Sequence, residues 1–315
     1  MGELASQVRV WVDGRLVGDE PSFSALDHGI TVGDGVFETA KVVDGRVFGL
    51  TRHLERMERS LAGLGLPPLD RARLQDGIEA VLSVGPLAFG RLRWTVTAGP
   101  GPLGSERTPG RTTYLVTAAE VPRPPRATPV AVVPWARNEV GALTGLKTTS
   151  YADNVVAVTA ARRVGATEAV LPNTAGNLCE GTGSNVFVVV DGVVRTPSLR
   201  DGPLAGVTRE LAIEWLREEG VEVVEESLPM SVLDQAEEVW ITSSVRDVCA
   251  VSRLEVTGPA TTVGGLTLPA PPVTPRALGE GPGPLALLAQ DLFARRCAAD
   301  MDPVRGGFRR SGGGR

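Results

Sequence analysis

The sequence predicts an α+β protein of two domains, and three observations support this. The chain has 315 residues, whereas a single domain averages about 150. Both halves contain strand-like segments of alternating or β-branched apolar residues, separated by helical segments. The proline-rich segment 121–129 predicts a stiff linker between the halves. We therefore expect an N-terminal α+β domain over 1–120 and a C-terminal α+β domain over 130–302, followed by a disordered Gly/Arg-rich tail over 303–315.

The first half begins with two predicted hairpins. Asp13-Gly14 and Asp44-Gly45 each lie between β-branched runs, which is the strongest short signal for a two-residue hairpin. Lys41 lies in a strand of the second hairpin, and we expect it to be an exposed cation. Leucine and methionine then recur every three or four residues, which predicts helix, and two alternating segments predict a strand pair. These predicted elements cover residues 51–64, 71–84, 91–99 and 111–120.

The second half alternates strands with helices. Asp191-Gly192 predicts a third hairpin. The segment 204–220 predicts an amphipathic helix with one apolar face formed by Val207, Leu211, Trp215 and Leu216. A helix is also expected from Ala152, and residues 264–284 are expected to be loop. The remaining predicted strands and the last helix cover residues 129–137, 168–197, 221–229, 237–245 and 285–300.

Composition excludes several classes of protein. The chain has 37 acidic and 32 basic residues, a net charge of −5, which gives no general attraction to nucleic acid or anionic membranes. The sequence predicts neither a transmembrane helix nor a secretory signal. The three cysteines, Cys179, Cys249 and Cys297, have no metal-site or disulfide-framework spacing. We expect a soluble, cytoplasmic protein without a metal site.

The lysine content is unusual. Among the 32 basic residues only Lys41 and Lys147 are lysines. Arginine stays protonated in proteins, whereas a lysine amine becomes a nucleophile once its pKa is lowered. The retained lysines are therefore either remaining surface cations or candidates for amine chemistry.

Three segments are candidates for binding a phosphate. Gly206-Val207-Thr208 stands at a predicted helix start, where backbone N–H groups and the helix dipole favour an anion. Thr242-Ser243-Ser244 follows a predicted strand and offers small hydroxyl side chains. Arg52, in the first turn of its helix, offers a bidentate guanidinium. Each signal alone is equally compatible with a structural role, such as a helix cap.

Lys147 and Glu180 form the most informative pair. Lys147 lies in a loop of small polar residues between a strand and a helix, where desolvation would free its amine to act as a Schiff-base lysine. Glu180 lies in a tight turn of small residues. A carboxylate there could keep a pyridine nitrogen protonated, although Glu180 alone is equally a solvated turn residue.

Taken together, these segments resemble the class IV aminotransferase family of pyridoxal-phosphate enzymes, of fold type IV. That family contains branched-chain aminotransferases, D-amino-acid transaminases and aminodeoxychorismate lyases. The resemblance runs from about Val8 to about Asp302. It rests on ordered blocks that read DHGITVGDGVFETAKVVDG, LTRHLERM, LKTTSYADN, EAVLPNTAGNLCEGTGSNVFVV, LAGVTREL and EVWITSS.

The resemblance implies a role for each of these residues. Lys147 would bond the cofactor, pyridoxal 5'-phosphate, and Glu180 would face its pyridine nitrogen. The residues that would hold the phosphate are Arg52, Val207, Thr208, Ser243 and Ser244. The resemblance also implies a homodimer and a small-molecule substrate.

The subfamily depends on fewer residues. Branched-chain enzymes typically carry a tyrosine five residues after the lysine, but here that position is Ala152, and Tyr151 stands one place early. D-Amino-acid transaminases carry an Arg-x-His pair, whereas this chain has Arg91 and Arg93 with no histidine nearby. Asn154 and the segment 91–107 are more similar to the aminodeoxychorismate lyases.

We therefore expect a lyase that converts 4-amino-4-deoxychorismate to 4-aminobenzoate and pyruvate, with an amino-acid aminotransferase as the alternative. The Lys147 amine would remove a proton, and aromatisation would favour the product. Arg91 and Arg93 share one strand face and are candidates for a substrate carboxylate, as are Tyr151 and Asn154 for substrate contacts; the two arginines could equally form structural ion pairs. A non-catalytic cofactor-binding protein is the third interpretation, which the intact Lys147 and Glu180 disfavour.

Overall fold

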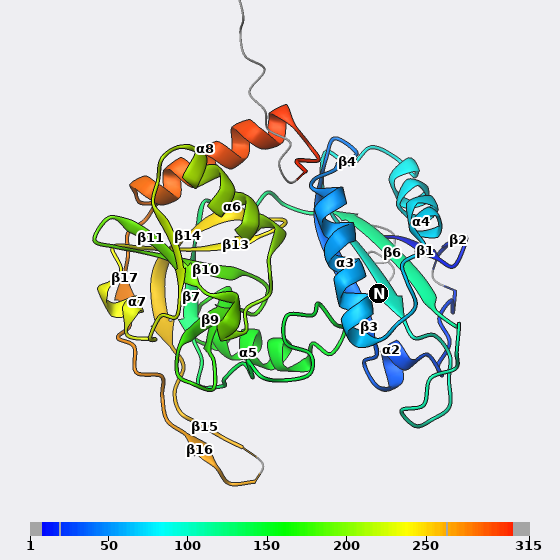
Figure 1. Cartoon of the computed structure of the whole chain (residues 1–315), viewed down its shortest axis with the longest axis horizontal. Helices are drawn as coiled ribbons and strands as arrows, with labels where there is room; N and C mark the ends of the chain where they lie inside the picture. Colours follow the sequence, from blue (N-terminus) through cyan, green and yellow to red (C-terminus); the bar gives the residue numbers. More distant parts are fainter. Residues whose placement is uncertain (1–7, 19, 263, 305–315) are drawn as a thin grey trace, which may run out of the picture. The chain divides into compact units, whose positions relative to one another are not determined.

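The computed structural model describes residues 8–18, 20–262 and 264–304, and the chain divides into two compact units (Figure 1). Unit 1 comprises residues 1–122 and 295–315, and unit 2 comprises residues 123–294. The division falls inside the expected linker 121–129, but strand β7 (Ala127–Val132) already begins there. Residues 295–302, which we expected in the second domain, belong to unit 1. Of the expected tail, residues 305–315 lie outside the described residues.

Unit 1 is built on a six-stranded antiparallel sheet with the order β2-β1-β6-β5-β3-β4. Both Asp-Gly hairpins of this sheet are confirmed. Asp13 and Asp44 adopt positive φ angles of 46° and 48°, and the glycine after each is also positive, as a two-residue hairpin requires. The strands are β1 (Val8–Val12), β2 (Arg15–Val17), β3 (Gly35–Val43), β4 (Arg46–Val47), β5 (Phe89–Thr97) and β6 (Thr113–Glu120).

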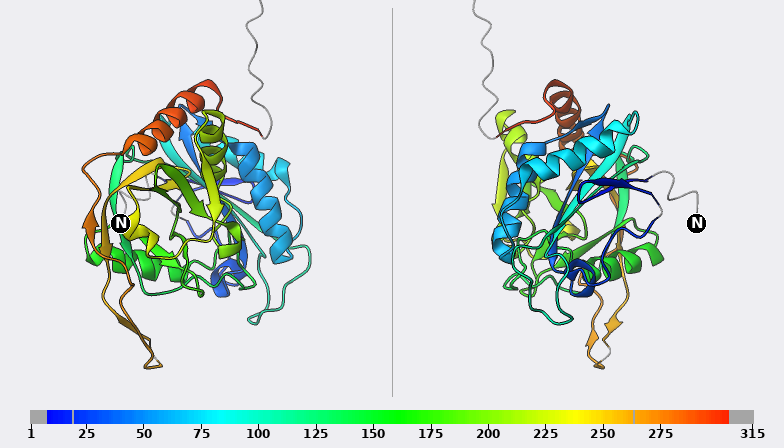
Figure 2. Two further views of the ribbon diagram at one scale, coloured as in Figure 1. Left: turned by 60° about the vertical axis from the view of Figure 1, so that its left-hand side comes forward. Right: turned by 90° about the vertical axis from the view of Figure 1, so that its right-hand side faces the viewer.

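Two helices, α3 (Leu50–Leu64) and α4 (Arg71–Ser83), cover one face of this sheet (Figure 2, blue and cyan). Met57 of α3, Ile78 of α4 and Trp94 of β5 share one buried cluster. Gly77 allows α4 to approach the sheet closely, because an added Cβ would lie 2.7 Å from the Trp11 ring. A one-turn helix, α2 (His28–Thr31), precedes β3.

Lys41 is not the exposed cation that we expected. The side chain is only 3% exposed. Its Nζ lies 4.4 Å from the centre of the Phe48 ring and 3.3 Å from Sγ of Cys297. Cys297 belongs to the last turn of helix α8 (Pro284–Ala299), so residues distant in the sequence cover this part of β3.

Unit 2 is built on a nine-stranded mixed sheet with the order β12-β11-β10-β13-β14-β7-β8-β9, and β17 pairs with β14. The pairs β11–β12, β14–β7 and β7–β8 are parallel, and the others are antiparallel. The remaining strands are β8 (Glu168–Pro172), β9 (Leu178–Gly181), β10 (Asn185–Val190), β11 (Val193–Pro197), β12 (Val223–Glu226), β13 (Glu238–Ser243), β14 (Asp247–Val256) and β17 (Arg276–Ala277).

The loop expected over 264–284 is interrupted by two short strands. They are β17 and β16 (Thr267–Leu268), and β16 pairs with β15 (Ala260–Thr261). The third Asp-Gly hairpin is confirmed between β10 and β11, where Asp191 has a φ of 52°.

Helices pack against both faces of the unit 2 sheet. Successive residues from β7 to Val133 point toward opposite faces of the sheet. Ala131 and Val133 pack with Ala157 of α5 (Ala152–Arg163), whereas Val130 and Val132 join the cluster that contains residues of α7 (Val232–Gln235). The predicted apolar face of α6 (Val207–Glu218) is buried throughout. Within the described ranges, no helix combines the length and apolar character needed to cross a membrane.

Candidate active site

Lys147 lies in the loop that leads into α5, as predicted, and is half-buried. Its Nζ is 5.9 Å from the centre of the ring of Tyr151, the residue that precedes the helix. An aromatic ring within about 6 Å attracts an ammonium group. The short loop and the start of the helix therefore hold the amine and the phenol side by side.

Glu180 lies in β9, beside the glycine-rich turn, and is 9% exposed. Its Oε2 accepts a hydrogen bond from the Leu204 N–H at 2.9 Å, and its Oε1 lies 3.2 Å from Nε of Arg137. Burial raises the pKa of the Glu180 carboxyl above its ordinary value, and the charges of Arg137 and Lys147 and the Leu204 N–H oppose this rise. Glu180 is thus a buried, oriented carboxyl group and not a solvated turn residue.

Arg137 is a further candidate site residue, which the sequence alone did not indicate. Its Nη2 donates a hydrogen bond to Oδ1 of Asn154 at 2.7 Å, while its Nε faces Glu180. No local pattern distinguishes Arg137 from the other arginines of the chain. Asn154 is 5% exposed and is occupied by Arg137, so it orients the partner of the carboxylate.

A second network holds Tyr151. Its hydroxyl donates to the carbonyl oxygen of Thr182 at 2.6 Å, and burial raises the pKa of the Tyr151 hydroxyl, with the nearby charge of Glu180 adding to the rise. The Thr182 hydroxyl donates to the buried Glu168 carboxylate, which also pairs with Arg246 at 2.5 Å. The turn that carries Thr182 is therefore anchored from two sides, and the phenol with it.

The start of α6 has the features of an anion site. The residue that precedes the helix is Gly206, which supplies no side-chain cap for the first N–H groups. A Cβ at Gly206 would lie 2.0 Å from Oδ1 of Asn185, so only glycine fits there. Asn185 in turn donates to the Leu204 carbonyl at 2.8 Å and pairs across the sheet with Thr242.

Two buried hydroxyl groups remain near this helix start. Among the described residues, Oγ1 of Thr242 and Oγ of Ser184 are buried without a hydrogen-bond partner. Ser184 directly precedes Asn185, and Thr242 directly precedes Ser243. Leu204 contacts both Glu180 and Asn185, and Asn185 pairs with Thr242. These contacts bring Glu180, the helix start at Val207 and Thr208, and the 242–244 segment close together.

The other predicted site residues, Arg52, Arg91 and Arg93, belong to unit 1. Arg52 is buried in α3, and its Nε donates to the carbonyl oxygen of Pro303 at 2.8 Å. Arg91 is exposed, whereas the Arg93 guanidinium lies 3.7 Å from the centre of the Phe37 ring. The two arginines alternate with core residues of β5 as expected, but their predicted roles stay predictions.

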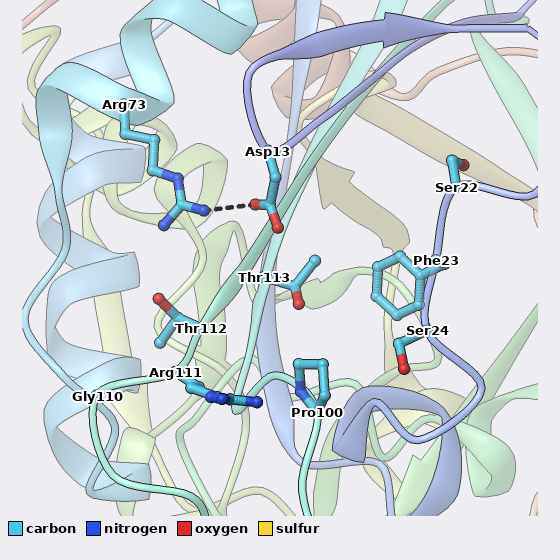
Figure 3. A pocket seen from close by; sticks show the side chains of 10 residues that line it. All are labelled: Asp13, Ser22, Phe23, Ser24, Arg73, Pro100, Gly110, Arg111, Thr112 and Thr113. Atoms are coloured by element: carbon cyan, nitrogen blue, oxygen red, sulfur yellow. Dashed lines mark hydrogen bonds and ion pairs between the residues drawn. The ribbon is translucent and has the colours of Figure 1, made fainter.

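Unit 1 also has a separate hollow of about 510 Å³, shown in Figure 3. An ion pair between Arg73 and Asp13, 2.7 Å long, stands on one side of it, and Phe23 lies on the other. None of its ten lining residues is a predicted site residue. The hollow offers no lysine amine and is not the site of the predicted chemistry.

Comparison with known proteins identifies the family. Residues 35–254 match the family described as amino-transferase class IV, and the chain belongs to this family. A protein of Methanocaldococcus jannaschii, provisionally named a branched-chain-amino-acid aminotransferase, is 34% identical over 79% of this chain and 88% of its own length. The aminodeoxychorismate lyase of Bacillus subtilis is 29% identical over 78% of this chain and 86% of its own length.

The fold is confirmed as fold type IV. The solved structure of a fold IV transaminase from Curtobacterium pusillum is 28% identical and has a TM-score of 0.73. The match covers 91% of this chain and 98% of that one. The chain is therefore a class IV enzyme with the predicted α+β architecture.

Enzymes of this family use pyridoxal phosphate, which is the cofactor predicted from the sequence. The site residues of unit 2 fit its three functional parts. Lys147 offers an amine for the carbonyl group, and Glu180 offers a buried carboxyl group for the ring nitrogen. The uncapped start of α6 and the partnerless Thr242 hydroxyl among the described residues offer donors for the phosphate.

Proposed function

We propose that this chain is an amino-acid aminotransferase whose substrates are branched-chain amino acids. The observation that carries the proposal is the position of Tyr151. In the linear sequence this tyrosine stands one place earlier than is typical of the branched-chain enzymes. In the fold its ring nevertheless lies 5.9 Å from Lys147 Nζ, and Glu180 acts on its pKa. The 34% identity with the Methanocaldococcus jannaschii relative supports the same activity.

The lyase that we expected from the sequence becomes the second candidate. Its support is the 29% identity with the Bacillus subtilis aminodeoxychorismate lyase. Asn154, one of the two features that favoured it beside the segment 91–107, is occupied by Arg137 and has a sufficient role in orienting the partner of Glu180. We therefore favour the aminotransferase activity over the lyase activity.

In the proposed mechanism, Lys147 performs the proton transfers. Pyridoxal phosphate, when bound, supplies a carbonyl carbon that bonds amines and a ring that withdraws electrons. Lys147 Nζ would hold the cofactor through this carbonyl carbon. Its amine would also remove the proton from the substrate α-carbon. Tyr151, held by the Thr182 carbonyl, confines that amine on one side.

Glu180 has the complementary electrostatic role. Its carboxylate would stabilise the protonated ring nitrogen, because an opposite charge nearby favours the charged form. The Leu204 N–H and Arg137 keep the carboxylate oriented. The first N–H groups of α6 and the hydroxyls of Thr208, Ser243 and Ser244 would bind the phosphate. Arg52 is proposed for the same group from the family resemblance alone.

The first experiment is a visible spectrum of the purified enzyme with each substrate in turn. For an aminotransferase, we expect L-leucine or another branched-chain amino acid to remove the cofactor band stoichiometrically and a 2-oxo acid to restore it. With 4-amino-4-deoxychorismate we expect no multiple-turnover release of pyruvate. A persistent band with pyruvate rising far above the enzyme concentration would establish the lyase instead.

We further propose that the protein is a homodimer. On α5, the neighbouring Val155 and Val156 are 58% and 54% exposed, and contiguous exposed apolar residues are typical of protein–protein contact surfaces. A second copy of this chain would cover them. The predicted cytoplasmic location likewise remains a proposal.

Sedimentation equilibrium should give twice the chain mass for the wild-type protein. The double replacement Val155→Asp and Val156→Asp should weaken association at least tenfold, since it places charges in an apolar contact. Val84→Asp, at a similarly exposed valine after α4, is the matched control. A monomeric wild-type protein at micromolar concentration would contradict the dimer.

A further inference from the structure

Lys41 is the second of the two lysines, and the proposed function does not use it. It is 3% exposed, in a chain that supplies nearly all of its other cations as arginine. Burial of a lysine costs free energy that a surface cation does not incur. An arginine fork is also larger and does not react as an amine. A compact amine therefore suits this buried position better than a guanidinium group.

The amine of Lys41 is in contact with a thiol. Cys297 is 8% exposed, and its Sγ lies 3.3 Å from Nζ, within hydrogen-bonding distance for sulfur. The buried Phe48 ring covers the amine from another side, 4.4 Å away. The two groups are 256 residues apart in the chain, and both belong to unit 1. The fold therefore holds an amine and a thiol together away from bulk water.

This arrangement suits oxidative coupling. The thiolate is the form of cysteine that peroxides oxidise, and a neighbouring ammonium group stabilises a thiolate. A sulfenic acid formed at Sγ would lie directly beside the amine. Burial raises the pKa of the Cys179 thiol and raises that of Cys249 to about 11, which disfavours the thiolate form at both positions.

We propose that Lys41 and Cys297 form a site of oxidative cross-linking, in which one oxygen atom bridges Nζ and Sγ. In the first step, hydrogen peroxide converts the thiol to a sulfenic acid and leaves as water. In the second step, a second peroxide accepts two electrons from the nitrogen. One amine N–H bond and the sulfenic O–H bond break, the N–O bond forms, and two further waters leave. The product is an N–O–S bridge between β3 and the last turn of α8.

The bridge would stabilise unit 1. A cross-link reduces the conformational entropy of the unfolded chain, and the reduction grows with the length of the closed loop. The loop between Lys41 and Cys297 contains most of the chain. We expect the oxidised protein to melt roughly 5 °C higher than the reduced protein, and reduction by a dithiol should reverse the change.

Mass spectrometry of the peroxide-treated holoenzyme tests the proposal. The intact protein should gain one oxygen and lose two hydrogens. After digestion with trypsin, peptide 16–46, uncleaved at Lys41, should be linked to peptide 297–305. Treatment with dithiothreitol should separate the two peptides and restore the free thiol.

Two variants isolate the bridge. Lys41→Arg keeps the positive charge and should leave a simple oxidised Cys297 with no linked peptides and no melting shift. Cys249→Ser is the matched control, since the Sγ of Cys249 lies beside the Pro125 carbonyl, and this variant should retain the bridge.

Oxidation of Cys297 in the wild-type protein without linkage would overturn the proposal. So would an unreacted Cys297 at peroxide levels that oxidise methionine. Loss of two hydrogens without a gain of oxygen would show a direct N–S bond and overturn the bridging oxygen.

Discussion

Replacing Lys147 by alanine is expected to lower kcat by at least about 10³-fold, because the variant lacks the amine that we propose both bonds the cofactor and transfers the proton. The visible band of the bound cofactor should shift to that of the free aldehyde. Borohydride reduction should no longer fix the cofactor to the protein. Peptide mapping of the reduced wild-type protein should locate it on Lys147.

The scarcity of lysine makes this experiment unusually clean. With Lys147 removed, the only other lysine in the chain is Lys41. The Lys41→Arg variant is therefore the matched control, and it should keep the band and the reducible bond. If Lys147→Ala protein were still labelled to the wild-type level, the assignment of Lys147 would be wrong.

The Glu180→Gln variant is expected to lose about 10²–10³-fold in kcat, the usual effect of removing one preorganised electrostatic group from an active site. Glutamine keeps the shape of the side chain but cannot carry the negative charge that favours a protonated ring nitrogen. Steady-state kinetics with a branched-chain amino acid would measure the loss. Glu222→Gln, on the exposed loop before β12, is the control and should retain wild-type kcat.

The Glu180→Gln replacement should not destabilise the cofactor-free protein as the pH rises from acidic to neutral values. Burial raises the pKa of Glu180 in the folded state, so the folded protein holds this proton at pH values where the unfolded chain has released it. The contribution of Glu180 to the free energy of unfolding is therefore fully present below the pKa that it has in the unfolded chain. This contribution is lost as the pH rises through the pKa that it has in the folded protein. Glutamine does not titrate, so the variant escapes this loss.

Melting curves of the cofactor-free proteins between pH 4 and 8, roughly the range in which a carboxyl with a raised pKa titrates, would measure this difference. We expect the wild-type Tm to fall relative to that of Glu180→Gln as the pH rises. A variant that is inactive and also much less stable at every pH would show that Glu180 has a structural role. This outcome would contradict the cofactor role that we propose for it.

The local elements were predictable because they depend on neighbouring residues. At Asp13, Asp44 and Asp191 the Asp-Gly pairs take the positive φ angles of two-residue hairpins, a conformation that these residues tolerate better than others. The helices α3, α4 and α6 begin and end within a few residues of their predicted positions, since their apolar periodicity extends over several turns.

The surroundings of the site residues were not predictable in the same way. The loop position of Lys147 and its association with Glu180 were predictable, whereas Asn154 was interpreted as a subfamily signal and Arg137 was not predicted as a site residue. Their joint role depends on Arg137 reaching both Asn154 and Glu180, which are 17 and 43 residues further along the chain. Such contacts arise from the order of strands in the sheet, which spacing along the chain does not encode.

The sequence by itself determined the family and the two-unit α+β architecture and singled out Lys147 as the candidate reactive lysine, because ordered motifs and residue chemistry are properties of the linear chain. Only the tertiary structure decided that Glu180 is buried, that Arg137 contacts both Glu180 and Asn154, and that Lys41 contacts Cys297. The physical reason is that burial and contact depend on which distant segments pack together. The pKa and the reactivity of a side chain follow from that packing.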